Sequence, residues 1–132
     1  MRKRILRECL RIARSKCNPS HPQYGCYIHF SFVVQDNKII EYGVNREGSP
    51  IEGFGYPEFG KIHSENDAYR KAKGILSNPK SFEVVNIRLN KQGEMRLSKP
   101  CECCYAFLSV VGCRDVYYST EEETFNKVSL CG

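Results

Sequence analysis

Two short motifs constrain the fold of this chain more than any other feature of the sequence. The first reads His-Ser-Glu at positions 63–65, and the second reads Pro-Cys-Glu-Cys-Cys at positions 100–104, after a gap of 34 residues. Imidazole and thiolate groups are preferred zinc ligands, and a catalytic zinc site keeps one position for water, whereas a structural site is closed by four protein ligands. Glu65 would stand beside that open position. The three expected metal ligands are His63, Cys101 and Cys104.

The spacing within the first motif indicates where a helix begins. Glu65 lies two residues after His63, so both side chains reach one site only if a helix starts at this point. Small and apolar residues then recur with helical periodicity. The stripe that we expect to be buried consists of Ala68, Ala72, Ile75 and Leu76.

The second motif predicts another helix start. Proline is favoured in the first helical turn, where its missing N–H leaves no hydrogen bond unmade. Pro100 is therefore expected to open a helix, and two cysteines three residues apart then project from one face of its first turn. Two helix N-termini would converge on the metal, and their positive ends favour thiolates over thiols. The buried stripe of this helix is predicted to contain Cys104, Phe107, Leu108 and Val111.

The combined pattern, H-x-E followed by P-C-x-x-C, resembles the signature of the cytidine deaminase superfamily of zinc-dependent nucleobase deaminases. Residue types, order and spacing all agree, and the resemblance covers nearly the whole chain, from about residue 4 to residue 120. It implies a Zn2+ cofactor and the hydrolytic deamination of a cytosine base to uracil, with release of ammonia.

The resemblance also implies roles for individual residues. Glu65 would be the catalytic residue, a general acid/base that carries a proton from water to the ring nitrogen and then to the leaving ammonia. The backbone N–H of Ser64 would receive the base carbonyl. Asn45 matches an asparagine that contacts the sugar in many relatives, although an asparagine after a strand is equally consistent with a simple turn.

The remaining cysteines leave an alternative open. A purely structural zinc site could recruit Cys103 or Cys113 as its fourth ligand, but Glu65 would then be unexplained. Eight cysteines in 132 residues would suggest disulfides in a secreted protein. The basic N-terminus is followed by charged residues at 7, 8 and 11 rather than by an apolar signal core, and no stretch could span a membrane. We therefore expect free thiols and a cytoplasmic location.

The net charge of +5 is concentrated at one end of the sequence. Residues 1–16 hold seven Lys and Arg residues and one acidic residue, which leaves thirteen basic and fourteen acidic residues elsewhere. A helix is predicted over residues 3–15 with a buried stripe of Leu6, Cys9, Leu10 and Ala13. Its other face carries Arg4, Arg7, Arg11 and Arg14. A solvated basic face is the ordinary interpretation, and a track for a nucleic-acid backbone is the alternative.

Alternating apolar residues predict strands over residues 28–34, 38–44, 82–89 and 115–120, with a hairpin turn at Asp36-Asn37. The residues after 120 are too few for a crossover to a parallel neighbour. We therefore expect Phe125, Val128 and Leu130 to form an antiparallel returning strand. The prediction is a single domain, residues 1–132, of the α/β class: a three-layer cytidine deaminase-like fold with a mixed central sheet of about five strands and helices on both faces.

Three further segments are candidates for contact with the substrate. The connection over residues 46–61 is rich in glycine, proline and aromatic residues, and loops of this length are usually functional or disordered. We interpret it as a lid over the pocket, with a packed surface loop as the alternative. By the resemblance, residues 96–99 also border the substrate. His29 is expected to be a sheet-face histidine rather than a metal ligand.

These observations favour a deaminase of free cytidine, deoxycytidine or their monophosphates, because compact free-nucleoside deaminases end in an antiparallel strand pair. The candidate partners for a phosphate are Arg46, Lys61, Arg96 and Lys99. One alternative is a polynucleotide cytosine deaminase that acts on single-stranded DNA or RNA. A second alternative is a non-enzymatic, zinc-stapled binding module. We expect no membrane partner, and we expect a homo-oligomer, as is common among compact members of the superfamily.

Overall fold

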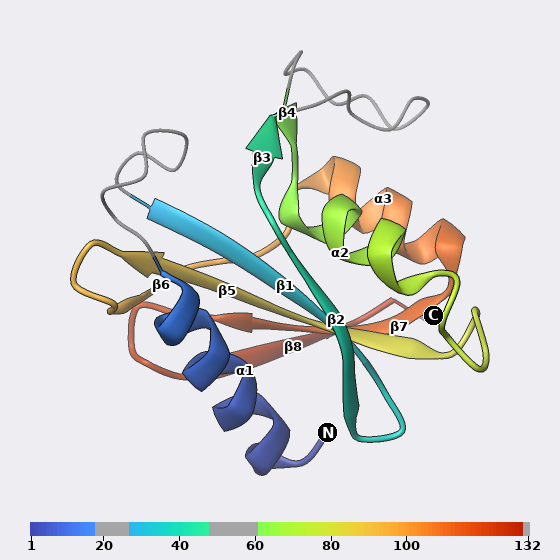
Figure 1. Ribbon diagram of the computed structural model, residues 1–132, viewed down its shortest axis with the longest axis horizontal. Coiled ribbons are helices and arrows are strands. Elements are labelled where there is room, and N and C mark those ends of the chain that lie inside the picture. The colour runs from blue at the N-terminus through green and yellow to red at the C-terminus, as the bar shows by residue number, and fades with distance from the viewer. Residues whose placement is uncertain (18–26, 48–60, 131–132) are drawn as a thin grey trace.

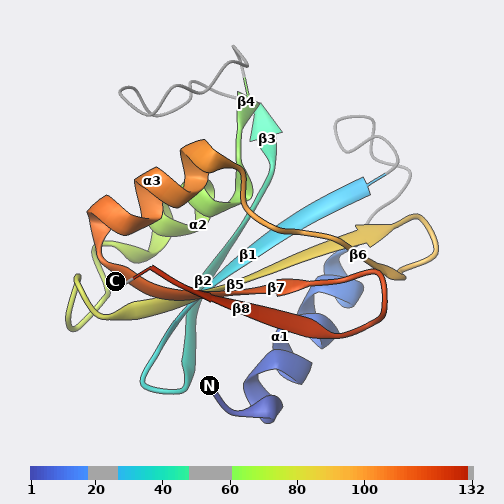
Figure 2. The same cartoon turned by 180° about the vertical axis from the view of Figure 1, so that it is seen from behind.

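A mixed β-sheet runs through the centre of the molecule, with one helix on one face and two helices on the other (Figure 1, Figure 2). The computed structural model describes residues 1–17, 27–47 and 61–130. The helices are α1 (Lys3–Lys16), α2 (Ser64–Ala72) and α3 (Glu102–Val111). The strands are β1 (Tyr27–Gln35), β2 (Lys38–Val44), β3 (Arg46–Glu47), β4 (Lys61–Ile62), β5 (Phe82–Asn90), β6 (Met95–Arg96), β7 (Cys113–Ser119) and β8 (Phe125–Ser129).

The strand order of the main sheet is β2-β1-β5-β7-β8, and the short strand β6 pairs with β5. Strands β5 and β7 are parallel, and every other described pair in this sheet is antiparallel. The last pair, β7 with β8, is antiparallel as predicted, with Val116 opposite Val128. Three layers, a mixed sheet and helices on both faces therefore confirm the predicted architecture.

The β1–β2 hairpin forms where the sequence predicted it. Asp36 and Asn37 have φ angles of 52° and 58°. A two-residue hairpin loop requires positive φ at both central positions, and Asn and Asp tolerate that conformation better than most residues. Gln35 then lies opposite Lys38 at the first pair of the register.

Alternation along the strands divides the core into two clusters. On one face, α1 packs Cys9 and Ala13 against Phe30 of β1 and Ile87 of β5. On the other face, α2 and α3 bring Ala68, Ala72, Phe107 and Leu108 against Val33, Val84 and Val116. Helix α1 therefore lies on the face opposite to the two helices that carry the motifs. This separation matters for function, because the basic helix cannot approach the metal ligands from that face.

The structure corrects several details of the predicted helices. In α1, Leu6 and Leu10 are only partly buried, whereas Ile5, which the predicted stripe did not contain, is buried. Ile75 was expected to be buried, but α2 ends at Ala72 and Ile75 is 59% exposed, because the helical periodicity stops at the turn that follows. Pro100 was expected to open the second metal helix, but α3 begins at Glu102. The proline lies two residues before the helix, and its fixed φ restrains the approach to the helix instead.

Three short strands were not predicted from the sequence. Strands β3 and β4 pair with each other and bracket the long connection into the first motif, with Arg46 opposite Ile62. Strand β6 pairs with the end of β5. Two-residue strands carry too little alternation to be recognised. Most of the connection that we interpreted as a lid, and the loop after α1, lie outside the described residues. Within the described ranges, no helix is long and apolar enough to cross a membrane.

Candidate metal centre and active site

Two of the predicted metal ligands occupy equivalent positions at the starts of two helices. His63 is the N-cap residue of α2, and Cys101 is the N-cap residue of α3. The carbonyl of His63 accepts the first helical hydrogen bond from the N–H of Asp67 at 3.1 Å, and the carbonyl of Cys101 accepts one from Tyr105 at 3.0 Å. Each ligand therefore lies at the positive end of a helix dipole, which favours anionic groups such as thiolates.

The structure brings together the three predicted ligands. The Nδ1 atom of His63 lies 3.4 Å from the Sγ atom of Cys104 and 3.7 Å from that of Cys101. All three ligand atoms lie within 4.8 Å of one another. A tetrahedral zinc ion with ordinary bond lengths separates its sulfur and nitrogen ligands by roughly 3.5–3.8 Å. The donor set and its spacing therefore fit a zinc ion.

The protonation state of the exposed ligand also suits a metal. A hydrogen bond from Cys104 lowers the pKa of the Cys101 thiol to about 3; burial opposes this shift, and a hydrogen bond with His63 adds to it. The thiolate, rather than the thiol, is the form that binds metals.

A fourth protein ligand is absent from this cluster, as far as the described residues go. Cys113 lies in β7, and its thiol donates a hydrogen bond to the carbonyl of Asp115 at 3.3 Å. Cys103, in the first turn of α3, does not belong to the cluster either. Neither candidate for a closed structural site therefore joins the other ligands, and three protein ligands are the pattern of a catalytic centre.

Glu65 follows the ligand His63 by two residues, and both of its carboxylate oxygens accept hydrogen bonds. Its side chain is buried in the first turn of α2 and is only 7% exposed. Oε1 accepts a hydrogen bond from the hydroxyl of Ser64 at 3.2 Å, and Oε2 accepts one from the amide of Asn86 at 3.0 Å. Sequence reasoning missed Asn86. The signal was present, because Asn86 stands in an otherwise apolar run of β5, on the side opposite to Val85 and Ile87.

The two predicted substrate contacts have structural roles as well. The side-chain oxygen of Asn45 accepts a hydrogen bond from the backbone N–H of His29 at 3.1 Å, and the Asn45 N–H donates to the His29 carbonyl at 3.4 Å. The hydroxyl of Ser64 lies 2.8 Å from that of Ser31. Contacts of Asn45 with a sugar and of the Ser64 N–H with a base remain predictions.

A row of basic residues crosses three strands on the same sheet face. His29 of β1 lies opposite Arg88 of β5, and Arg88 lies opposite Arg96 of β6. Burial, together with the charges of Arg88 and His63, lowers the pKa of His29 to about 4. His29 is therefore neutral at neutral pH, and it is not part of the metal cluster, in agreement with its interpretation as a sheet-face residue.

Two of the candidates for a phosphate contact already have partners within the protein. Arg96 donates to the carbonyl of Met95 at 3.1 Å and lies 3.8 Å from the carboxylate of Glu94. The Nε atom of Arg46 donates to Asp67 at 2.6 Å. Lys61 and Lys99 are exposed, and Arg96 is partly buried.

Two buried polar groups on the helices that carry the motifs have no hydrogen-bond partner among the residues that the structure describes. They are the side-chain amide of Asn66 in α2 and the hydroxyl of Tyr105 in α3. Burial raises the pKa of Tyr105, and the charges of Tyr118 and Glu65 raise it further. An unsatisfied buried group is uncommon in native proteins, so both residues are candidates for contact with a bound molecule.

No protein-family model matches this chain, and no curated protein sequence matches it. Several solved structures, in contrast, are similar to it. The chain is similar to the cytidine deaminase from Burkholderia pseudomallei, with 19% identity over 98% of this chain and 94% of the other, at a TM-score of 0.66. It is also similar to the dCMP deaminase from the cyanophage S-TIM5 in its apo form, with 19% identity over 89% of this chain and 84% of the other, at a TM-score of 0.56. The complex of that enzyme with dCMP and dUMP gives 18% identity, coverage of 89% and 82%, and a TM-score of 0.55.

These similarities show that the chain has the cytidine deaminase fold. Among the described residues, the group that could hold a metal is the one that the sequence motifs predicted, His63 with Cys101 and Cys104.

Proposed function

We propose that this protein is a zinc-dependent hydrolase that deaminates the cytosine base of free cytidine, deoxycytidine or their monophosphates. The observation that carries the proposal is a three-ligand metal cluster at the N-termini of two helices, with a buried carboxylate in the first turn of one of them. A structural zinc site or a binding module has no need of a buried Glu65, whereas hydrolysis needs a group that moves protons.

Each residue of the site would have its own role in the reaction. His63, Cys101 and Cys104 would hold zinc, which supplies an acidified water and a Lewis acid when it is bound. Glu65 would carry one proton of the water to the ring nitrogen of the base, where it stays in the product, and the second proton of the water to the departing amine. The net change adds one water, breaks the C4–N bond and releases ammonia, and it leaves a uracil base attached to the sugar. The N–H of Ser64 and the side chain of Asn45 would orient the base and the sugar.

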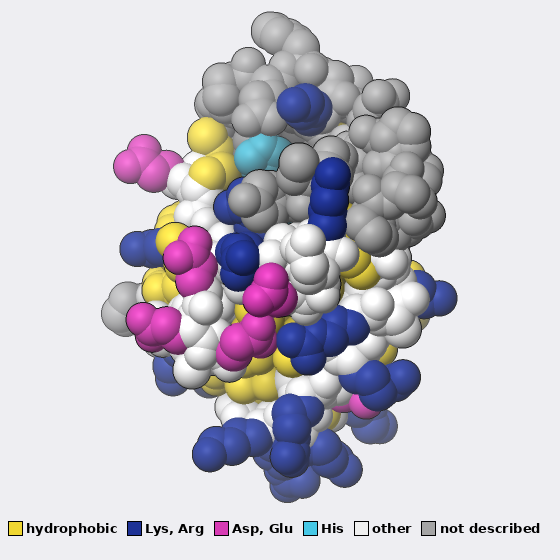
Figure 3. Space-filling view, turned by 90° about the vertical axis from the view of Figure 1, so that its left-hand side faces the viewer, with side chains coloured by type: hydrophobic (Ala, Val, Ile, Leu, Met, Phe, Trp, Pro, Cys, Tyr) yellow, Lys and Arg dark blue, Asp and Glu magenta, His cyan; other side chains and the backbone are white. Residues whose placement is uncertain are grey.

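The position of α1 supports a free nucleoside or nucleotide over a polynucleotide. This helix packs on the sheet face opposite to α2 and α3. In Figure 3, Lys and Arg side chains gather at the lower end of the molecule, while the visible histidine lies toward the upper end. A nucleic-acid backbone bound along α1 would therefore lie on the sheet face opposite to the helices that carry the metal ligands.

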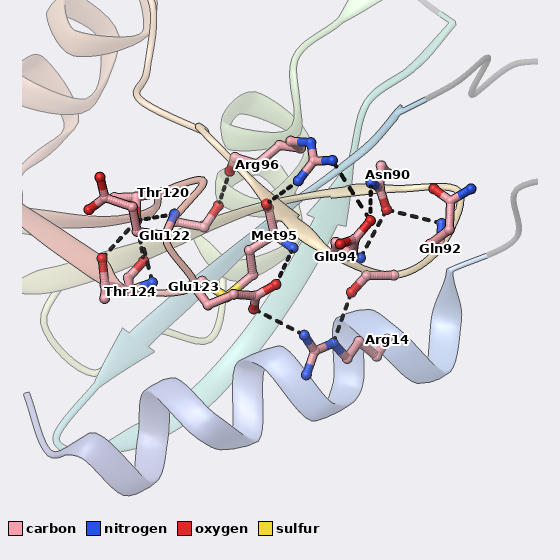
Figure 4. A network of polar contacts seen from close by, with 12 residues as sticks. Arg14, Asn90, Gln92, Glu94, Met95, Arg96, Thr120, Glu122, Glu123 and Thr124 are labelled. Atoms are coloured by element: carbon pink, nitrogen blue, oxygen red, sulfur yellow. Dashed lines mark hydrogen bonds and ion pairs between the residues drawn. The ribbon is translucent and has the colours of Figure 1, made fainter.

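Two of the α1 arginines also have partners within the protein. Arg14 donates to the carbonyl of Gly93 at 3.0 Å and to Glu123 at 3.2 Å (Figure 4). Arg11 forms an ion pair with Glu8. These contacts reduce the number of α1 arginines that a phosphate backbone could use. The antiparallel β7–β8 pair, as expected for a compact free-nucleoside deaminase, supports the same choice.

The cellular location and the oligomeric state of the protein are also part of the proposal. None of the six cysteines in the described ranges is in a disulfide, which supports a reducing, cytoplasmic environment. We also expect a homo-oligomer. Two large apolar side chains, Leu97 just before the second motif and Val110 on α3, are 47% and 64% exposed, and association would cover such side chains.

The proposal is tested by measuring ammonia release from cytidine, deoxycytidine, their monophosphates and single-stranded oligonucleotides in parallel. We expect turnover of at least one free nucleoside or monophosphate, and much slower turnover of the oligonucleotides. Turnover of oligonucleotides alone would establish the polynucleotide alternative. No turnover of any cytosine compound by zinc-loaded protein would reject the proposed function.

A further inference from the structure

Asn86 lies where the proposed proton carrier meets the segment that leads to a metal ligand. Its side chain is 3% exposed and projects from β5 toward the sheet face that carries α2 and α3. The amide nitrogen donates to Oε2 of Glu65 at 3.0 Å and to the carbonyl of Ser98 at 3.3 Å. Ser98 lies three residues before Cys101. One buried amide therefore contacts both halves of the site.

The orientation of this amide is fixed by its partners. Its oxygen accepts a hydrogen bond from the hydroxyl of Ser31 at 2.6 Å. On the nitrogen side, the partners are a carboxylate and a backbone carbonyl, which act as acceptors. A flipped amide would place its oxygen against two acceptors, so only one orientation satisfies the network.

Two side chains, those of Asn86 and Ser64, donate hydrogen bonds to Glu65, and the hydrogen bond from Asn86 is the better defined of the two. Ser31 gives its single hydroxyl proton to Asn86, so it must accept the hydrogen bond that joins it to Ser64 at 2.8 Å. Ser64 then shares its one proton between Ser31 and the longer contact to Glu65 at 3.2 Å. The amide nitrogen of Asn86 carries two protons, one for Glu65 and one for the carbonyl of Ser98, so neither proton has to be shared.

The backbone of Asn86 also binds the segment around Ser98, in addition to the contact that its side chain makes. The Asn86 carbonyl accepts a hydrogen bond from the hydroxyl of Ser98 at 2.8 Å, and that hydroxyl accepts one from the N–H of Ser119 at 2.8 Å. The Ser98 N–H donates to the carbonyl of Ser119 at 3.0 Å. Ser98 is therefore tied to β5 and to the end of β7 before the chain reaches the second motif.

We propose that Asn86 is a positioning residue that sets the Glu65 carboxylate relative to the segment carrying Cys101. This inference rests on the proposed function, because it assigns Asn86 a part in the proton transfer that Glu65 would perform. Without the amide, the carboxylate rotates on its own side chain, and the distance between proton carrier and metal ligands is no longer fixed. A misplacement of about 1 Å in an active site can cost roughly 100-fold in rate.

The first test measures kcat per bound zinc and KM for the best substrate. Asn86→Ala, and the equally shaped Asn86→Asp that lacks the N–H donor, should each lower kcat roughly 100-fold. KM should change less than about threefold, because Asn86 does not bind the substrate. The matched control is Asn90→Ala, which removes another buried asparagine of β5 whose hydrogen bonds go to Gln92 and Glu94 (Figure 4). Its kcat should stay within about twofold of the wild type.

The second test needs no activity. The stability losses of Glu65→Ala and Asn86→Ala should be clearly non-additive in the double variant, because the two side chains share a hydrogen bond. The losses of Glu65→Ala and Asn90→Ala should add. Additive losses for Glu65 and Asn86, or a kcat of Asn86→Ala within threefold of the wild type, would overturn the inference. If the wild type deaminates no cytosine compound, the proposed function fails, and the stability cycle alone decides whether Asn86 holds Glu65.

Discussion

Asp67 of α2 accepts a hydrogen bond from the backbone N–H of Val44, the last residue of β2, at 3.0 Å. The same carboxylate accepts a hydrogen bond from the Nε–H of Arg46 at 2.6 Å and lies 3.3 Å from the ammonium group of Lys71. Its side chain is 1% exposed. Because Glu65 lies in the same helical turn and Asn45 follows Val44, this contact fixes the helix bearing the proposed proton carrier against the strand that leads to Asn45.

The Asp67 contact predicts a pH dependence of stability. Burial raises the pKa of Asp67, but Arg46, the Val44 N–H and Lys71 together outweigh burial and hold its pKa below the ordinary value of 3.8. A carboxyl whose pKa is lower in the folded state stabilises the fold above its unfolded pKa and loses that contribution as the pH falls through the folded pKa. Wild-type stability should therefore fall with acidification below about pH 4.

The variant that checks this is Asp67→Asn. It should lose about 2 kcal/mol of unfolding free energy at neutral pH, and its stability should fall less steeply in acid than that of the wild type. Denaturant unfolding between pH 3 and pH 7 measures both. Glu8→Gln, which removes a carboxylate from an exposed ion pair, is the control and should barely change stability at neutral pH. Parallel acid profiles for wild type and Asp67→Asn would contradict the assignment.

Gly43 should be essential for the approach of α2 to β2. A Cβ atom at this position would lie 2.2 Å from the backbone nitrogen of Ala68, far inside any allowed contact. Gly43→Ala must therefore push the helix away, and we expect a loss of more than about 2 kcal/mol in stability and a fall in kcat. Gly74→Ala is the matched control, because nothing lies within 4 Å of its Cβ position. Thermal unfolding should show that control to be neutral or slightly stabilising.

The basic face of α1 supplies a test of substrate class. Arg4, Arg7 and Arg11 can be neutralised together as glutamines, whereas Arg14 is kept because it bonds Gly93 and Glu123. For a free nucleoside or monophosphate, kcat/KM should stay within about twofold of the wild type, because no ligand contact is lost. A rise in KM for single-stranded oligonucleotide, together with a flatter dependence of binding on salt, would instead show that α1 is a nucleic-acid track.

The sequence predicted the elements and ligands whose signals are local. Alternation and the Asp36-Asn37 turn located the main strands, and the spacing of His63, Cys101 and Cys104 identified a group that does meet in space. It did not predict the polar network around Glu65. Asn86 lies 21 residues from Glu65 in the sequence, and only the pairing of β1 with β5 brings it beside Ser31. Short strands such as β6 were missed because two residues show no periodicity.

The end of α2 is another feature that the sequence pattern did not predict. Ile75 fitted the helical stripe, yet the helix ends at Ala72 and the turn exposes that side chain. The stop depends on how the following residues pack onto the sheet, which includes the burial of Leu76 at the end of the turn. Periodicity describes a helix only up to the point where tertiary packing ends it.

The ligand assignment predicts the metal content of the purified protein. Wild-type protein should contain about one zinc ion per chain, because the structure brings three ligand atoms together. The double variant His63→Ala with Cys101→Ala should lose the metal. Zinc retained at full occupancy by this variant, measured by elemental analysis, would show that the metal binds elsewhere.

The central claim, a zinc site with Glu65 as its proton carrier, is tested most directly by one paired measurement on wild type and Glu65→Gln. Zinc content and ammonia release are determined on the same two samples, with the best substrate from the parallel assay. We predict equal zinc content and a kcat about 1000-fold lower in the variant, because glutamine keeps the shape of the side chain but cannot carry a proton. Full activity in Glu65→Gln, or loss of its zinc, would contradict the account.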